Sequence, residues 1–302
     1  MSIEYWKVNN ELNEVLYYKA QSKTPKLVLL LIPGNPGVVH YYKSFLEVVF
    51  NLTNKRVDII CVQHLGHAVK DKERKYLLRD QVDHKINFFD YLRKKKYKSL
   101  KNLKFVLSGH SIGAYMAIEL YQNRLHCNII KVIPLFPTLH SMLETPNGKK
   151  LNLLFNAPFR NIASTIVSGI SFLNELFPFV VISIIRFITK QSFTNALITC
   201  NHLLKSNIVY SALYLANDEM KHVTEIRTEV IEALTKKQEI FTFYYGATDE
   251  WSPIDHYYQM KMLLPNAEVY LCEDECPHAF VLEHGDIIGK KVANWILNQK
   301  LE

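Results

Sequence analysis

The sequence predicts an α/β protein with a mostly parallel central sheet, helices on both of its faces and an apolar helical insertion. Three observations favour this class. Continuous apolar segments recur along the chain, as expected of strands buried on both faces. Segments with apolar residues at helical spacing separate them. The alternation stops between Thr138 and Gln238 and then resumes. With 302 residues and 48% hydrophobic content, the chain is large enough for one such domain with its insertion.

The strands and helices can be placed in order. Segments 3–8 and 15–20 predict an opening hairpin of half-buried strands. Strands are predicted for the segments that follow, which are 26–33, 57–64, 105–108, 129–136, 240–246 and 268–272, and those at 26–33, 57–64, 105–108 and 240–246 are expected to be buried. Helical spacing is found between them over 41–52, 74–96, 256–264 and 286–299. We therefore expect a core made of residues 1–137 and 239–302, divided by a helical cap at 138–238.

The net charge is +7, and much of the excess lies in the basic run RKKKYKSLKNLK, residues 93–104. A solvated helix end with its following loop accounts for this run. Attraction to anionic lipid headgroups is the alternative. No zinc-finger or RNA-binding motif accompanies the charge, so nucleic acid is not expected as a partner.

The five cysteines are scattered, and Cys272 and Cys276 have no second pair with which to complete a zinc site. The histidines show no metal-ligand spacing, so we expect neither a metal nor a cofactor. The N-terminal segment 1–15 has no apolar signal core. These features favour a protein of the reducing, cytosolic side of the membrane.

A serine between two glycines follows one of the predicted buried strands. The segment GHSIG, residues 109–113, matches G-x-S-x-G, the nucleophile elbow of α/β-hydrolases. Its required context is present, because a strand precedes it and a helical pattern follows it. The glycines are needed because side chains beside the serine would collide with the strand and the helix. The pattern therefore predicts Ser111 as a nucleophile.

A nucleophilic serine needs a base that takes its proton and an acid that orients the base. In this fold the acid and then the base follow the serine along the chain. Asp249 follows the strand at 240–246 and His278 follows the strand at 268–272, so both are expected at the carboxyl edge of the sheet. Asp249 is preferred over the other nearby acids, which are Glu250, Asp255, Asp274 and Glu275.

Acyl transfer also needs two N–H donors for the oxyanion. One is expected to be the amide of Ile112, directly after the serine. The second is expected from the loop IPGNPG, residues 32–37. Pro33 and Pro36 have no N–H, so Asn35 is the predicted donor.

Three further histidines have simpler explanations. His64 and His67 follow a strand and are expected to shape a turn beneath the site. His110 is expected to point into the surroundings of the sheet and away from the substrate.

Residues 161–190 carry only two charges before their closing lysine, Glu175 and Arg186. The uncharged core at 176–185 is about half of the roughly 20 residues that a membrane-spanning helix needs, and Pro178 would kink a helix. Two interpretations remain open, a cap that shields a pocket and a segment that enters a lipid monolayer without crossing it. In the second, the side chains expected to enter the lipid are Phe177, Phe179, Val181, Ile184 and Ile185.

The segments LIPGNPG, LRDQVDHK, SGHSIGAY, GATDEW and CPHAFV together resemble the lipid droplet-associated hydrolase family over nearly the whole chain. The resemblance implies an α/β-hydrolase fold with a triad of Ser111, Asp249 and His278. It implies lipid ester substrates, with sterol esters among those proposed. It also implies residence on lipid droplets and on the cytosolic face of the endoplasmic reticulum, with the apolar insertion as a monotopic targeting element.

Two functions from different classes follow from these observations. The first is a serine esterase that acts on lipid esters at a lipid surface. The second is a droplet-bound structural or clustering protein that barely uses its triad. A complete Ser-Asp-His set favours the esterase, since a purely structural role gives no reason for all three residues. A soluble hydrolase of small esters is disfavoured by the apolar insertion.

Overall fold

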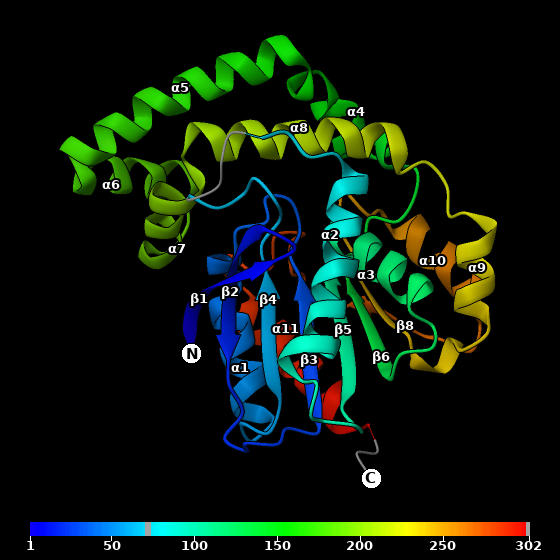
Figure 1. Ribbon diagram of the computed structural model, residues 1–302. Helices are drawn as coiled ribbons and strands as arrows, with labels where there is room; N and C mark the ends of the chain where they lie inside the picture. Colours follow the sequence, from blue (N-terminus) through cyan, green and yellow to red (C-terminus); the bar gives the residue numbers. More distant parts are fainter. Residues whose placement is uncertain (70–73, 300–302) are drawn as a thin grey trace.

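A single eight-stranded sheet forms the centre of the computed structural model, which describes residues 1–69 and 74–299 (Figure 1). Its strands follow the spatial order β1-β2-β4-β3-β5-β6-β7-β8. From β4 to β8 all neighbours are parallel, whereas β2 is antiparallel to both β1 and β4. The strands are β1 (Ser2–Val8), β2 (Glu11–Tyr18), β3 (Leu27–Ile32), β4 (Asp58–Val62), β5 (Lys104–His110), β6 (Ile129–Leu135), β7 (Thr242–Gly246) and β8 (Glu268–Cys272). The predicted hairpin and the mostly parallel sheet are confirmed.

Strand β3 shows why its sequence is apolar without alternation. All six of its residues are buried. Val28, Leu30 and Ile32 belong to the hydrophobic core on one face of the sheet. Leu27, Leu29 and Leu31 belong to the core on the other face. Because successive side chains point to opposite faces, a strand covered on both sides needs an apolar residue at every position.

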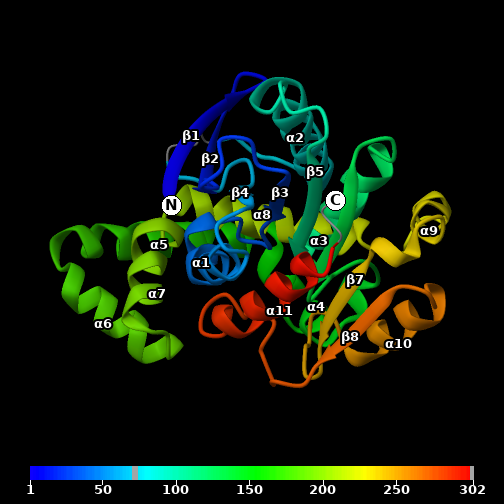
Figure 2. The ribbon, with the colours of Figure 1, turned by 90° about the horizontal axis from the view of Figure 1, so that it is seen from below.

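Helices cover both faces of the sheet, as Figure 2 shows. On one face α1 (Lys43–Leu52) packs against α11 (Gly285–Leu297). The other face carries α2 (Leu78–Tyr91), α3 (Ile112–Asn123) and α10 (Ile254–Leu263). The predicted helices are present, although α2 begins later than the pattern indicates. It begins there because the carboxylate of Asp80 accepts a hydrogen bond from the N–H of Leu77, at 2.8 Å, and caps the helix.

The insertion between β6 and β7 is helical. Helix α8 lies across the carboxyl edge of the sheet, α5 packs on α8, and α6 and α7 project to one side (Figure 1). A chain of six α-helices makes up the insertion in the described residues, and they are α4 (Pro146–Leu151), α5 (Ala157–Leu176), α6 (Pro178–Thr189), α7 (Phe193–Ile198), α8 (Ser206–His222) and α9 (Thr228–Thr235).

The apolar segment 161–190 is divided at its proline. Phe177 leaves the helical conformation, with φ −134° and ψ 60°, and Pro178 is the first residue of α6. Proline has no N–H and cannot continue the hydrogen-bond ladder of α5, so the chain forms two helices. None of the helices formed by residues 1–69 and 74–299 has the length and apolarity that crossing a membrane requires.

The basic run at 93–104 lies far from this apolar segment. It connects the end of α2 to the start of β5, at the amino edge of the sheet, while α8 covers the carboxyl edge (Figure 1). Lys94 pairs with Asp90 at 3.0 Å, and the ammonium group of Lys96 lies 3.9 Å from the ring centre of Trp6. The run is therefore a helix end that is partly held by packing.

Candidate active site

Ser111 lies at the turn between β5 and α3, in a backbone conformation with φ 56° and ψ −124°. A positive φ is costly for a residue with a side chain. The glycines on either side explain how the turn forms. A Cβ at Gly109 would lie 2.2 Å from the carbonyl oxygen of Gly113, and a Cβ at Gly113 would lie 2.3 Å from the carbonyl oxygen of Ile32. Only glycine fits at these two positions without a backbone shift.

Ser111, His278 and Asp249 are joined by hydrogen bonds. The Oγ of Ser111 lies 2.8 Å from Nε2 of His278, and Nδ1 of His278 lies 2.6 Å from Oδ2 of Asp249. The three side chains come from the ends of β5, β8 and β7, which meet at one edge of the sheet. A neutral imidazole with its proton on Nδ1 donates to the carboxylate and accepts from the serine hydroxyl.

The carboxylate of Asp249 is buried and fixed by its own loop. Its Oδ1 accepts hydrogen bonds from the N–H groups of Trp251, at 2.8 Å, and Ser252, at 3.1 Å. This leaves Oδ2 for His278. The other candidate acids point elsewhere or lie on other elements. Asp274 pairs with Lys291 at 2.9 Å, and Asp255 is in the first turn of α10.

His110 has a part in the site that the sequence did not indicate. Its Nε2 lies 2.8 Å from the carbonyl oxygen of His278, and its Nδ1 lies 2.7 Å from the hydroxyl of Tyr42. A carbonyl oxygen only accepts, so Nε2 carries the proton and Nδ1 accepts from Tyr42. Burial lowers the pKa of His110 to about 3, which keeps the ring neutral in this arrangement. His110 thus packs below the site, as expected, but it also anchors the loop of His278.

In the segment 33–37 after β3, one N–H group has no acceptor in the described residues. Pro33 and Pro36 have none. The N–H of Gly34 donates to the hydroxyl of Tyr42 at 2.7 Å, and the N–H of Gly37 donates to Nδ1 of His67 at 2.9 Å. The N–H of Asn35 remains. Ile112, as the first residue of α3, likewise has no intrahelical acceptor for its N–H.

His67 therefore shapes the loop beneath the site, as its sequence position indicated. His64 lies beside it, and a Cβ at Gly37 would come within 2.6 Å of the His64 ring. Burial lowers the pKa of both histidines. They are neutral side chains that support the turn.

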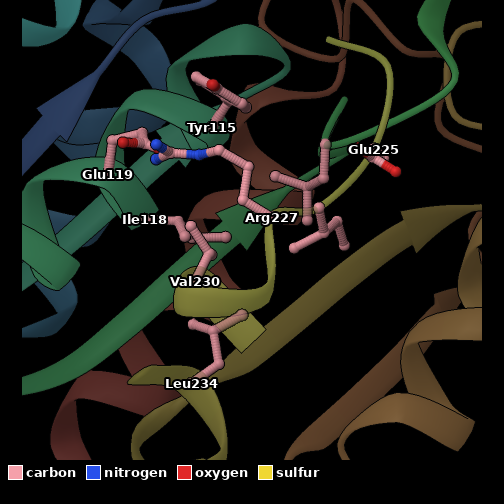
Figure 3. A pocket seen from close by; sticks show the side chains of 9 residues that line it. Tyr115, Ile118, Glu119, Glu225, Arg227, Val230 and Leu234 are labelled. Atoms are coloured by element: carbon pink, nitrogen blue, oxygen red, sulfur yellow. The ribbon is translucent and has the colours of Figure 1, made fainter. Parts of the chain in front are cut away.

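A separate pocket lies between α3 and α9, away from Ser111. Apolar side chains of Ile118, Val230 and Leu234 line it, and Arg227 reaches across to Glu119 on α3 (Figure 3). None of the triad residues contributes to its wall.

The fold and the arrangement of Ser111, His278 and Asp249 define the class, an α/β-hydrolase. Solved structures of this class superpose on nearly the whole chain. They include haloalkane dehalogenase DbeA from Bradyrhizobium elkani, with a TM-score of 0.70 and 15% identity over 98% of this chain and 97% of that one. A thermophilic esterase from Thermogutta terrifontis gives a TM-score of 0.63 and 14% identity over 98% of both chains. At these identities the likeness shows the fold alone.

The sequence gives the family. The profile described as "Lipid-droplet associated hydrolase" matches residues 25–281, and the chain belongs to this family. The lipid droplet-associated hydrolase of Gallus gallus is 32% identical, over 92% of this chain and 87% of its own. That of Rattus norvegicus is 31% identical over 94% and 89%, and that of Dictyostelium discoideum 29% over 94% and 91%. Family and fold together support a hydrolase.

Proposed function

We propose that the protein is a serine hydrolase of lipid esters that works at the surface of lipid droplets. The observation that carries this proposal is the hydrogen-bonded chain from Ser111 through His278 to Asp249. This chain of hydrogen bonds lies beneath the helical insertion, which leaves Ser111 only 8% exposed (Figure 1). A buried serine that accepts an apolar ester from above is suited to an acyl-enzyme mechanism.

In the proposed reaction, Oγ of Ser111 attacks the ester carbonyl carbon while Nε2 of His278 takes the hydroxyl proton. The N–H groups of Ile112 and Asn35 stabilise the resulting oxyanion. His278 then gives its proton to the leaving alcohol, and the acyl group stays on Ser111. Water, deprotonated by His278, then attacks the acyl carbon. The bond between this carbon and Oγ of Ser111 breaks, Oγ takes the proton from His278, and the fatty acid leaves. Asp249 keeps the imidazole oriented and stabilises its charged form.

The proposed lipid surface is the apolar outer side of α5 and α6. Phe179 is 77% exposed and Phe187 is 86% exposed. Large exposed apolar patches on a soluble domain mark sites of interaction. The other exposed apolar side chains of these helices are Phe159, Ile162, Ile166, Phe172, Leu173, Leu176, Phe177, Val180, Ile184 and Ile188. With α5 and α6 lying in a monolayer, as a monotopic element, the cap would be at the lipid surface.

The relatives are named for lipid droplets, and this name supports droplet association. The family resemblance also implies the cytosolic face of the endoplasmic reticulum, which is the second proposed location. Sterol esters are the proposed substrate within the broader class of lipid esters, as the resemblance to the lipid droplet-associated hydrolase family implies.

The alternative is a structural or clustering protein on droplets with little hydrolase activity. The projecting apolar surface of α5 and α6 favours it, since such a surface holds a protein on lipid whether or not the triad reacts (Figure 1).

The deciding experiment is labelling with a fluorophosphonate probe, together with turnover of a cholesteryl ester emulsion. Wild type should be labelled and should release fatty acid. Ser111→Ala should do neither while it keeps its melting temperature. Ser22→Ala, on an exposed loop serine, is the matched control and should behave as wild type. Unlabelled, inactive wild type would favour the structural alternative.

A further inference from the structure

A carboxyl group of the cap contacts the loop that follows β3. Glu219 lies in the last turn of α8 and is 2% exposed. Its Oε1 accepts a hydrogen bond from Nδ2 of Asn35 at 3.1 Å. The same Nδ2 donates to the carbonyl oxygen of Ala212, also on α8, at 2.8 Å. Within the part of the chain that the structure describes, the side-chain amide of Asn35 is therefore held only by α8.

The contact between Asn35 and α8 affects the direction in which the backbone N–H of Asn35 points. The N–H groups of Gly34 and Gly37 are bound within the core, by Tyr42 and His67. Asn35 itself has no such backbone anchor among the described residues. Gly34, directly before it, lies close to His110 and Ser111, where a Cβ would come within 3.1 Å of both side chains, and it has no side chain of its own to hold this peptide. The side chain of Asn35 is then the part that fixes this peptide.

We propose that Glu219 is a positioning residue, which from the cap fixes the side chain of Asn35 and so directs the Asn35 N–H at the oxyanion. The inference rests on the proposed hydrolase function, because it needs Asn35 in the oxyanion hole. It also makes the oxyanion hole depend on the cap being in place. An N–H misdirected by a fraction of an ångström loses much of its effect on the transition state.

The charge of Glu219 gives the contact a pH dependence. Burial raises the pKa of Glu219 to about 8; the hydrogen bond from Asn35 opposes this, and Asp218 adds to it. The carboxyl group is thus neutral at pH 7. The elements that pack against α8 carry several acidic or basic side chains. They are Arg79, Asp80, Asp83, His84, Lys85 and Asp90 on α2, Arg160 and Glu175 on α5, and Glu144 on the turn at Met142–Glu144. Neither these groups nor Lys221 and His222 on α8 itself are among the causes that shift the pKa of Glu219. Asp218 is the one charged group among those causes.

The direction of the pH effect on activity follows from the position of the Glu219 carboxyl group near the oxyanion. A neutral carboxyl group accepts from Asn35 without placing charge near the oxyanion. Once ionised, it opposes the negative charge that develops there. Activity should therefore fall as the pH rises through about 8.

The test measures kcat and KM of the full chain with a p-nitrophenyl ester in detergent. Glu219→Leu removes the acceptor, and Glu219→Gln keeps an acceptor that cannot ionise. Asp218→Ala is the matched control, because Asp218 ties the same turn of α8 to the N–H of Leu78, at 2.8 Å, without contacting Asn35. Glu219→Leu should lower kcat by roughly 10-fold to 10²-fold, below the 10²–10³ expected for losing a whole donor. KM should change little.

Asp218→Ala should lower the melting temperature and leave kcat unchanged at pH 6, well below the pKa of Glu219. Its alkaline decline should begin at a lower pH than that of wild type, because Asp218 raises the pKa of Glu219. Glu219→Gln should keep kcat at pH 7 and retain activity above pH 8, where wild type declines. An unchanged kcat in Glu219→Leu, or an equal loss in Asp218→Ala, overturns the inference. If Glu219→Leu does not fold, the pH profile decides, and an alkaline decline in Glu219→Gln equal to that of wild type overturns it. A wild type that is neither labelled by fluorophosphonate nor active overturns the proposed function instead, and this inference with it.

Discussion

Nε2 of His110 donates a hydrogen bond to the carbonyl oxygen of His278, at 2.8 Å, so the residue before the proposed nucleophile holds the loop of the proposed base. The same ring accepts from Tyr42, whose oxygen accepts in turn from the N–H of Gly34. One buried chain of hydrogen bonds thus links the oxyanion loop to the base loop, beneath Ser111.

The first prediction concerns this chain. His110→Ala should lower kcat by about 10²-fold, because a displacement of the His278 loop by about 1 Å is enough for such a loss. Tyr42→Phe keeps the ring but removes the hydroxyl, and it should give a smaller loss. Esterase kinetics at pH 7.5 measure both, and circular dichroism checks folding. Wild-type kcat in His110→Ala would show that the loop of His278 holds itself.

The second prediction concerns the acid. Asp249→Asn should lower kcat by a factor on the order of 10⁴, because an amide stabilises the wrong imidazole tautomer. Asp274→Asn is the control from the loop of His278, and it loses only a surface ion pair with Lys291. Its kcat should stay within about twofold of wild type. The reverse pattern would make Asp274 the acid.

The third prediction uses two glycines in helices. Gly113→Ala should prevent folding or abolish activity, since its Cβ would lie 2.3 Å from the carbonyl oxygens of both Ile32 and Pro33. Gly169 in α5 has open space around it. Gly169→Ala should therefore stabilise the protein, by roughly 0.5–1 kcal/mol. Thermal unfolding measures both. Equal melting temperatures for the two variants would contradict the packing at Gly113.

The fourth prediction concerns acid stability. His40, on the turn after β3, stacks on His202 of the insertion with ring centres 3.6 Å apart. Burial lowers the pKa of each to about 4. A histidine with a depressed pKa in the folded state stabilises the protein fully above its unfolded pKa, near 6.5. That contribution should decline as the pH falls from about 6.5 through 4.

His202→Phe keeps a stacked ring that cannot be protonated. Melting temperatures measured from pH 7.5 to pH 4.5 should fall less steeply for this variant than for wild type. The neighbouring charges are Glu14, whose carboxylate lies 3.5 Å from Nδ1 of His40, and Lys43 and Lys205, which favour the neutral rings. If the melting temperatures of the variant and of wild type fell equally steeply with pH, other groups would cause the acid sensitivity.

The sheet and the order of the triad could be predicted because local patterns determine them. Outside the insertion, the continuous apolar segments form strands of the sheet, and the parallel strands bring their carboxyl ends to one edge. The contacts of His110 and Glu219 could not be predicted. Asn35 and Glu219 are 184 positions apart, and only the docking of α8 brings them together. The burial of Val181 could not be predicted either. It is buried beside α7, although it is an apolar residue like its exposed neighbours.

The last prediction concerns lipid binding by α5 and α6. Changing Phe177, Phe179 and Ile184 to Ser removes three exposed side chains, each worth roughly 1.5–3 kcal/mol when buried. The basic run at 93–104 cannot act on the same surface. The seven residues of β5 span roughly 20 Å at about 3.3 Å each, more than twice the Debye length of about 8 Å.

In a droplet flotation assay the serine variant should therefore sink, and a variant with Lys94, Lys95 and Lys96 changed to Gln should float as wild type does. The matched control changes the exposed apolar residues Ile254, Tyr258 and Met262 of α10 to Ser, and it should also float. If the serine variant floats and the glutamine variant sinks, α5 and α6 form only a cover for the active site, and the amino edge of the sheet faces the lipid.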